Sequence, residues 1–128
     1  MAPALFIKAI LEGKPINMFG SGASSRDYTY IDDIIKGIVK TLDTNLDFEI
    51  INLGNSNPVP LKKFITVLRK LSGKNLKIKK VSERPGDVIK TSANIDKAKD
   101  FLEWQPRVKF ADGLKNTYEY FCKFYSLF

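Results

Sequence analysis

The first helix that the sequence predicts is apolar on nearly all of its sides. Residues 4–11 read ALFIKAIL, with Lys8 as the one charge, and residues 12–15 (EGKP) supply a helix stop. A helix of this composition is expected to be buried on several sides, but a chain of 128 residues builds one ordinary core that can hardly surround it. We therefore expect one compact domain, residues 1–128, that is part of a larger protein.

The rest of the chain alternates short extended segments with helices, which is typical of a mixed α/β fold. Strands are expected at residues 16–19, 28–31, 48–53 and 76–78. Helices are expected after Asp32 as N-cap, from Pro60 to a stop at Gly73, after Asn94, and over residues 114–125. The helix after Asp32 has one apolar stripe that we expect to be buried. The stripe is Ile34, Ile35, Ile38, Val39 and Leu42, with Asp33, Lys36, Lys40 and Asp43 opposite.

Composition excludes several kinds of site. One cysteine and no histidine rule out an internal disulfide and leave the usual zinc sites without ligands, so no metal is expected. The apolar runs are too short to span a bilayer and no secretory signal pattern is present, so we expect a cytoplasmic protein without a membrane partner. A net charge of +7 implies an anionic partner, either nucleic acid or a phosphorylated small molecule.

The loop at residues 82–87 (SERPGD) is the most informative stretch for function. It places a fixed cation and a carboxylate three residues apart around a rigid Pro-Gly turn. Arg84 offers a planar fork of donors to phosphate oxygens, and Asp87 can accept hydrogen bonds from sugar hydroxyls. The same residues could instead form an ordinary surface turn with an Arg-Asp ion pair, and the local pattern alone leaves both interpretations open.

A second candidate phosphate contact is Arg26, directly after a loop that contains Gly20 and Gly22. Taken alone, its pairing with Asp27 or Asp32 in a structural turn is the simpler interpretation. Ser25 stands where a dinucleotide-binding fingerprint needs its third glycine, so the loop does not predict a nicotinamide-cofactor site.

Several segments, in their order along the chain, carry a family resemblance. They are residues 9–16 (AILEGKPI), 26–33 (RDYTYIDD), 52–54 (NLG), 84–87 (RPGD), 102–106 (LEWQP) and 113–114 (GL). Together they resemble the C-terminal region of the extended short-chain dehydrogenases, in the group of NAD-dependent UDP-sugar epimerases and dehydratases. The resemblance implies a small mixed α/β substrate-binding domain whose Rossmann domain is absent.

The resemblance also implies roles for individual residues. Arg26 and Arg84 would hold the diphosphate of a UDP-sugar, Asp87 would meet the ribose, and the strand from Asn17 to Phe19 would lie against the uracil. The implied parent reaction is a 4-epimerisation that uses NAD, which this chain alone is not expected to bind.

The residues that perform chemistry in this family are missing. The sequence has no glycine-rich GxxGxxG turn, and no tyrosine is followed by lysine four residues later, so no catalytic residue is expected. Glu103 also stands where the family has glycine before tryptophan. We therefore expect a chain that begins inside a longer gene product, is inactive alone, and depends on a missing Rossmann domain or a partner chain that supplies it. An uncovered first helix further predicts a homo-oligomer.

Two alternatives remain open at this stage. The parent could be a dTDP-sugar 4,6-dehydratase, or the chain could be a basic module that binds nucleic acid. The second is disfavoured because the aromatic residues lie mainly at core-facing helical positions, and the lysines and arginines of residues 62–80 are more simply a solvated face. Our expectation is therefore a UDP-sugar ligand and no nucleic acid.

Overall fold

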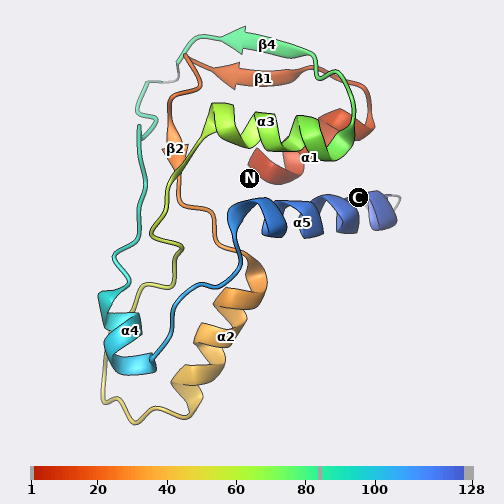
Figure 1. The fold of residues 1–128 in the computed structure, drawn as a ribbon. Helices are drawn as coiled ribbons and strands as arrows, with labels where there is room; N and C mark the ends of the chain where they lie inside the picture. The colour runs from red at the N-terminus through yellow and green to blue at the C-terminus, as the bar shows by residue number, and fades with distance from the viewer. Residues whose placement is uncertain (1, 84, 126–128) are drawn as a thin grey trace.

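The computed structural model describes residues 2–83 and 85–125 and confirms a small α/β fold (Figure 1). Its elements in chain order are α1 (Ala2–Leu11), β1 (Ile16–Phe19), β2 (Ser25–Arg26), α2 (Ile31–Leu42), β3 (Val59–Pro60), α3 (Leu61–Ser72), β4 (Ile78–Val81), α4 (Asp96–Leu102) and α5 (Phe110–Phe124). They form two groups, which we call the upper lobe (α1, β1, α3, β4 and α5) and the lower lobe (α2, α4 and residues 43–58 and 93–108) after their places in Figure 1.

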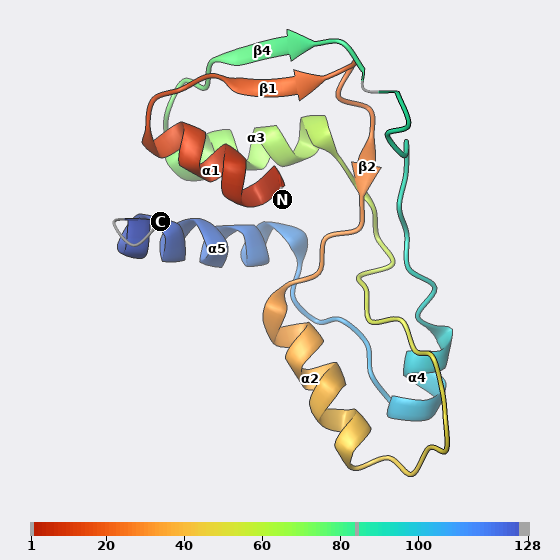
Figure 2. The ribbon, with the colours of Figure 1, turned by 180° about the vertical axis from the view of Figure 1, so that it is seen from behind.

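The upper lobe is layered. β1 and β4 pair in parallel, from Ile16 opposite Ile78 to Phe19 opposite Val81. Helices α1 and α3 lie beneath this pair, and α5 lies below them (Figures 1 and 2). Phe64 of α3 is fully buried at the centre, where its ring meets those of Phe6, Tyr28 and Phe110. This cluster joins α1, α3 and α5.

Helix α3 follows from its sequence. Pro60 precedes its first turn, and Phe64, Ile65 and Leu68 form the buried face. Gly73 ends the helix in the left-handed conformation, with φ of 62°, which glycine adopts at little cost. The predicted start and stop of this helix are both confirmed.

The lower lobe has a smaller core of its own. Ile95, Ala98, Leu102 and Trp104 are buried in it, and Leu46, Ile51, Leu53 and Ala93 pack against them. The indole N–H of Trp104 donates to the carbonyl of Asp33 at 2.9 Å. The tryptophan therefore joins the end of α4 to the start of α2.

The burial of α2 is the reverse of the prediction. Asp33 and Gly37 are buried, whereas Ile35, Ile38, Val39 and Leu42 are each more than half exposed. Gly37 explains the reversal, because it lets the helix approach so closely that an added Cβ would lie 2.6 Å from Cδ1 of Leu53. The predicted buried stripe was therefore wrong.

Three further expectations need correction. Residues 28–31 are not a strand; the short strand is β2, and α2 begins at Ile31 with Tyr30 as its N-cap instead of Asp32. The rings of Tyr28 and Phe64 lie 5.2 Å apart, so packing holds this segment. Residues 48–53 are not assigned as a strand. α1 is not buried all round, because Leu5 is 64% exposed while Ile7 and Ile10 are buried.

Candidate functional site

Arg26 lies where two lobes of the chain are joined. It belongs to β2, which pairs antiparallel with β3 so that Arg26 is opposite Val59. Its side chain is half-buried, and Nη1 donates to the carbonyl of Ser25 at 2.9 Å. No ion pair joins Arg26 to an acidic residue within residues 2–83 and 85–125. The proposed structural pairing with Asp27 or Asp32 is therefore not formed.

The carboxylate of Asp27 binds backbone N–H groups instead of pairing with Arg26. Its carboxylate accepts hydrogen bonds from the backbone N–H groups of Ser56 (2.9 Å), Asn57 (3.3 Å) and Ala93 (2.9 Å). Its own N–H donates to the hydroxyl of Thr91 at 3.1 Å. Asp27 thus gathers two distant loops beside Arg26. Sequence reasoning missed this role, because the three donors are 29, 30 and 66 residues away along the chain.

The segment after the 82–87 loop runs alongside β2. The N–H of Ser25 donates to the carbonyl of Ile89 at 2.9 Å, and the N–H of Thr91 donates to the carbonyl of Ser25 at 3.2 Å. Asp87 is exposed two residues before Ile89, and no ion pair joins its side chain to another described residue. Arg84 lies outside the described residues. The backbone therefore carries Asp87 towards the strand that bears Arg26.

Asn17 and Phe19, the two candidate site residues on β1, point away from the core. Ile16 and Met18 are buried, whereas Asn17 is exposed and Phe19 is half-buried, as expected for alternating strand positions. The strand ends where the N–H of Gly20 donates to the carbonyl of Val81 at 2.9 Å. Glu83 lies directly against Gly20, where an added Cβ would meet its carboxylate. Phe19 therefore lies close to the start of the loop that leads to Asp87.

The half-buried phenol of Tyr28 lies near the guanidinium of Arg26. Burial raises the pKa of the Tyr28 phenol, and the neighbouring Arg26 guanidinium acts in the opposite direction. Tyr28 is thus neutral at physiological pH, and Arg26 is the charged group of this pair. No group of three or more His, Cys, Asp or Glu residues that could hold a metal ion occurs among the described residues.

The glycine loop after β1 does not fit a dinucleotide cofactor. Such a site needs a glycine-rich turn that leads from a strand into a helix, whose N-terminal N–H groups face the phosphates. Here the loop with Gly20 and Gly22 leads into β2 instead, an extended segment. The loop with Gly20 and Gly22 therefore lacks the strand–turn–helix geometry of a dinucleotide site.

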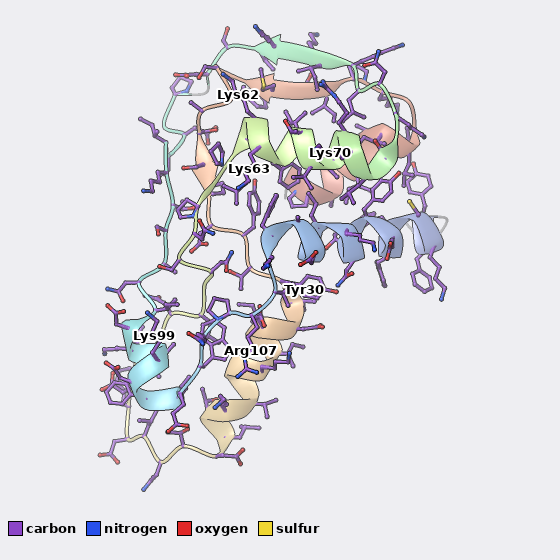
Figure 3. All side chains as sticks on the ribbon, viewed as in Figure 1. Tyr30, Lys62, Lys63, Lys70, Lys99 and Arg107 are labelled. Carbon is purple, nitrogen blue, oxygen red and sulfur yellow. The ribbon has the colours of Figure 1, made fainter. Side chains whose placement is uncertain are left out.

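The segments that carry the family resemblance meet in space. Asp33 Oδ2 accepts from the N–H groups of Arg107 (3.0 Å) and Val108 (2.8 Å). At Gly54, an added Cβ would lie 2.3 Å from Cβ of Ala93, and at Gly113, 3.1 Å from Tyr30. Figure 3 shows Tyr30 where α2 meets α5, with Arg107 beside α2. A side chain at Gly54 or Gly113 would crowd these neighbours, and the two N–H groups need the acceptor that Asp33 supplies.

The basic residues of α3 are arranged differently. Figure 3 shows Lys62, Lys63 and Lys70 spread along this helix, and all three are exposed. They lie on the solvent-exposed side of α3, away from its buried face, as expected for a solvated helix face. None of the helices in the described part of the chain has the length and apolar character needed to cross a membrane.

Comparison with known proteins identifies the family. The family model described as GDP-mannose 4,6 dehydratase matches residues 3–117. The UDP-glucuronate 4-epimerase of Thermodesulfobacterium geofontis is 45% identical over 113 residues, which make up 88% of this chain and 35% of the relative. The crystal structure of the Bacillus cereus UDP-glucuronic acid 4-epimerase, in complex with UDP-glucuronic acid and NAD, superposes with a TM-score of 0.91 at 38% identity, over 98% of this chain and 40% of that one.

A dehydratase also shares the fold. The structure of dTDP-glucose 4,6-dehydratase from Streptomyces venezuelae, with NAD bound, has a TM-score of 0.92 at 26% identity and covers 100% of this chain, which is 40% of that one. The chain thus spans 35% to 40% of the length of these relatives. It belongs to the family of NAD-dependent UDP-sugar epimerases and dehydratases.

Proposed function

We propose that this chain is the UDP-sugar-binding part of an NAD-dependent nucleotide-sugar 4-epimerase. The observation that carries the proposal is the placement of Arg26, whose guanidinium has no acidic partner among the described residues and whose strand β2 is hydrogen-bonded to the segment after Asp87. The higher identity to UDP-glucuronate 4-epimerases, 45% against 26% for the dehydratase, supports the epimerase branch.

Each site residue has a role that its chemistry suits. Arg26 and Arg84 hold the two phosphates, because guanidinium groups bind phosphate oxygens through paired N–H donors. Asp87 accepts a hydrogen bond from a ribose hydroxyl. Asn17 and Phe19 face the uracil from β1, with the ring of Phe19 offering apolar contact and the amide of Asn17 offering polar contact.

The chain contributes binding energy and orientation to such an enzyme. NAD, held by another part of the fold, supplies the hydride acceptor and donor for the reaction at C4 of the sugar. The grip on the remote nucleotide positions the reacting carbon, so binding energy spent on the UDP moiety serves the chemical step. The chain is inactive alone because it holds neither the cofactor nor a catalytic acid and base.

A titration of UDP into the purified chain tests this proposal. We expect saturable chemical-shift changes in ¹⁵N NMR spectra, centred on residues 25–27 and 85–91, with a Kd of about 1 mM because only half of a site is present. Arg26→Ala should abolish the changes. Arg107→Ala is the matched control, since Arg107 is exposed on the lower lobe and its loss removes the same charge. Folded protein without UDP-dependent shifts, or equal weakening by both variants, contradicts the proposal.

A dTDP-sugar dehydratase is the second candidate, favoured by the TM-score of 0.92 to the Streptomyces venezuelae structure. The two nucleotides differ at the ribose, because dTDP lacks the 2′-hydroxyl, and at the base. Parallel titrations with UDP and dTDP therefore separate the candidates. Preference for UDP that is reduced by Asp87→Ala supports the epimerase, and preference for dTDP supports the dehydratase.

A further inference from the structure

A hollow of about 360 Å³ lies between the first two turns of α3, the turn at residues 55–57 and the segment that leads into α5. We call it the α3–α5 hollow. Its floor is apolar, with Val59 buried and Val67, Val108 and Phe110 half-buried. This volume lies at the lower end of the range for pockets that bind small molecules. The hollow is therefore large enough for a small ligand.

The charged side chains that line the α3–α5 hollow are all cationic. Lys63 comes from α3, and Arg107 and Lys109 come from the segment before α5. All three are exposed, and within residues 2–83 and 85–125 none of them forms an ion pair. No aspartate or glutamate of the described chain lines the hollow. Three positive charges without a neighbouring carboxylate favour an anion there.

These cations are spread along the hollow. Figure 3 shows Lys63 beside the start of α3 and Arg107 beside α2. Both residues line the hollow, so positive charge is present at its two ends. Such a spread suits a ligand that carries more than one negative charge, since a single ionic group would reach only one end.

The start of α5 adds backbone donors to the same hollow. The N-cap of this helix is Lys109, whose side chain makes no capping hydrogen bond. The N–H groups of Phe110 and Ala111 donate to no other group in the described part of the chain, and both residues line the hollow. Free N–H groups give a helix start a partial positive charge. The helix dipole thus adds to the charge of the three side chains.

Two carboxylates hold the walls of the hollow without lining it. Asp27 accepts hydrogen bonds from N–H groups of the turn at residues 55–57, and Asp33 accepts those of Arg107 and Val108. Neither aspartate is among the lining residues, and backbone donors satisfy both carboxylates. The walls are therefore formed before a ligand binds, which lowers the cost of binding.

We propose that the α3–α5 hollow is a second anion site, which binds a small phosphorylated molecule independently of the nucleotide site at Arg26. The cations and the free N–H groups contact the phosphates, and the apolar floor contacts the carbon part of the ligand. Strand β3 contributes Val59 to the hollow, whereas β2, which carries Arg26, contributes no residue. The proposal therefore goes beyond UDP binding and does not depend on it.

The experiment titrates inorganic pyrophosphate into the purified chain at constant ionic strength. We expect saturable shifts in ¹⁵N NMR spectra at residues 55–57, 63 and 107–111, with a Kd of about 1 mM. Lys63→Ala and Lys109→Ala should each raise this Kd about 2- to 5-fold, the range for an exposed ion pair. Lys70→Ala is the matched control and should leave the Kd unchanged. Lys70 is exposed on the same helix as Lys63 but does not line the hollow.

Arg26→Ala separates the two proposed sites. It should leave the pyrophosphate shifts at residues 107–111 unchanged, although it abolishes the UDP shifts at residues 25–27. Each lysine that is replaced is exposed, so the dispersion of the spectra should show a folded chain in every variant. Three results overturn the proposal: a folded chain without saturable shifts, shifts confined to residues 25–27, or equal weakening by Lys70→Ala, which would indicate attraction to the net positive charge alone.

Discussion

The two lobes differ in how completely they bury their apolar side chains. In the upper lobe, Phe64, Ile7 and Leu68 are 0% exposed, and Leu5 and Tyr120 are the large apolar residues left outside. In the lower lobe, Trp104 is 3% exposed, but Leu42 and Phe48 on the opposite side are 79% and 83% exposed. The upper lobe thus buries most of its large apolar side chains, whereas the lower lobe leaves those on the outer side of α2 and at residues 48 and 50 exposed.

The candidate nucleotide site lies where the two lobes are joined. Arg26 and the segment that follows Asp87 are held by β2, β3 and the amide contacts of Asp27, all of which are formed in this chain. On our proposal, the contacts to the nucleotide are therefore preformed.

The largest expected effect is a core truncation. Phe64→Ala should lower the free energy of unfolding by about 3–5 kcal/mol, because it removes a fully buried ring and leaves a cavity. Ile38→Ala, on the exposed side of α2, should change the free energy of unfolding by no more than about 0.5 kcal/mol. Urea unfolding followed by circular dichroism measures both. Similar losses for the two variants would break the comparison.

The second effect concerns the anchor of α2. Asp33→Ala should cost about 2–3 kcal/mol, because the N–H groups of Arg107 and Val108 lose their acceptor. Asp32→Ala is the adjacent control; Asp32 is exposed, and its loss should cost about 0.5 kcal/mol or less. Fluorescence of Trp104, the one tryptophan, reports the lower lobe directly. Equal effects of the two aspartates would show that the amide contacts do not hold α2.

The third effect compares two helix ends. Gly73 after α3 and Glu103 after α4 both have left-handed backbones, with φ of 62° and 47°. Gly73→Ala should destabilise the chain by about 1 kcal/mol, and Glu103→Gly should stabilise it by about 0.5–1 kcal/mol, because a Cβ is strained in this region. Thermal unfolding of both variants gives the sign. A loss of stability in Glu103→Gly would mean that the Glu103 side chain contributes more than its strain costs.

The smallest expected effect is a pH dependence at the edge of the upper lobe. Hydrogen bonds from Lys14, and then from the Tyr125 hydroxyl at 2.7 Å, lower the pKa of Glu12 below its ordinary value of 4.5. A lowered pKa in the folded state stabilises it above the unfolded value, and this contribution is lost as the pH falls through the folded pKa. Carbon-13 NMR of the Glu12 carboxyl should show its pKa rise in Lys14→Ala. An unchanged pKa would contradict the contact.

Sequence patterns predicted the elements whose partners lie nearby. β1 was predicted with its observed ends, and α3 with its stop at Gly73, because alternation and helical spacing report burial within one element. The face of α2 was predicted wrongly. Its true anchor is a carboxylate that meets amides more than 70 residues later, and helical spacing carries no information about such a contact.

Part of the candidate site was also beyond sequence reasoning. Asn17 and Phe19 lie on β1, which side-chain alternation located, whereas Arg26 lies on β2 and the sequence predicted a strand at residues 28–31 instead. Asp27 was expected at most to pair with Arg26, because its three amide donors come from turns that fold against it only in three dimensions. The exposed apolar stripe of α2 was mistaken for a core face, because helical spacing does not show whether other residues cover the apolar side of a helix.

Amide hydrogen exchange of the chain, alone and with UDP, tests the central claim most directly. The account predicts that residues 25–27 and 85–91 gain protection when UDP is added, while β1 and β4 keep the protection they have in the free chain. A folded chain in which UDP adds no protection at residues 25–27 would contradict the claim that Arg26 holds the nucleotide.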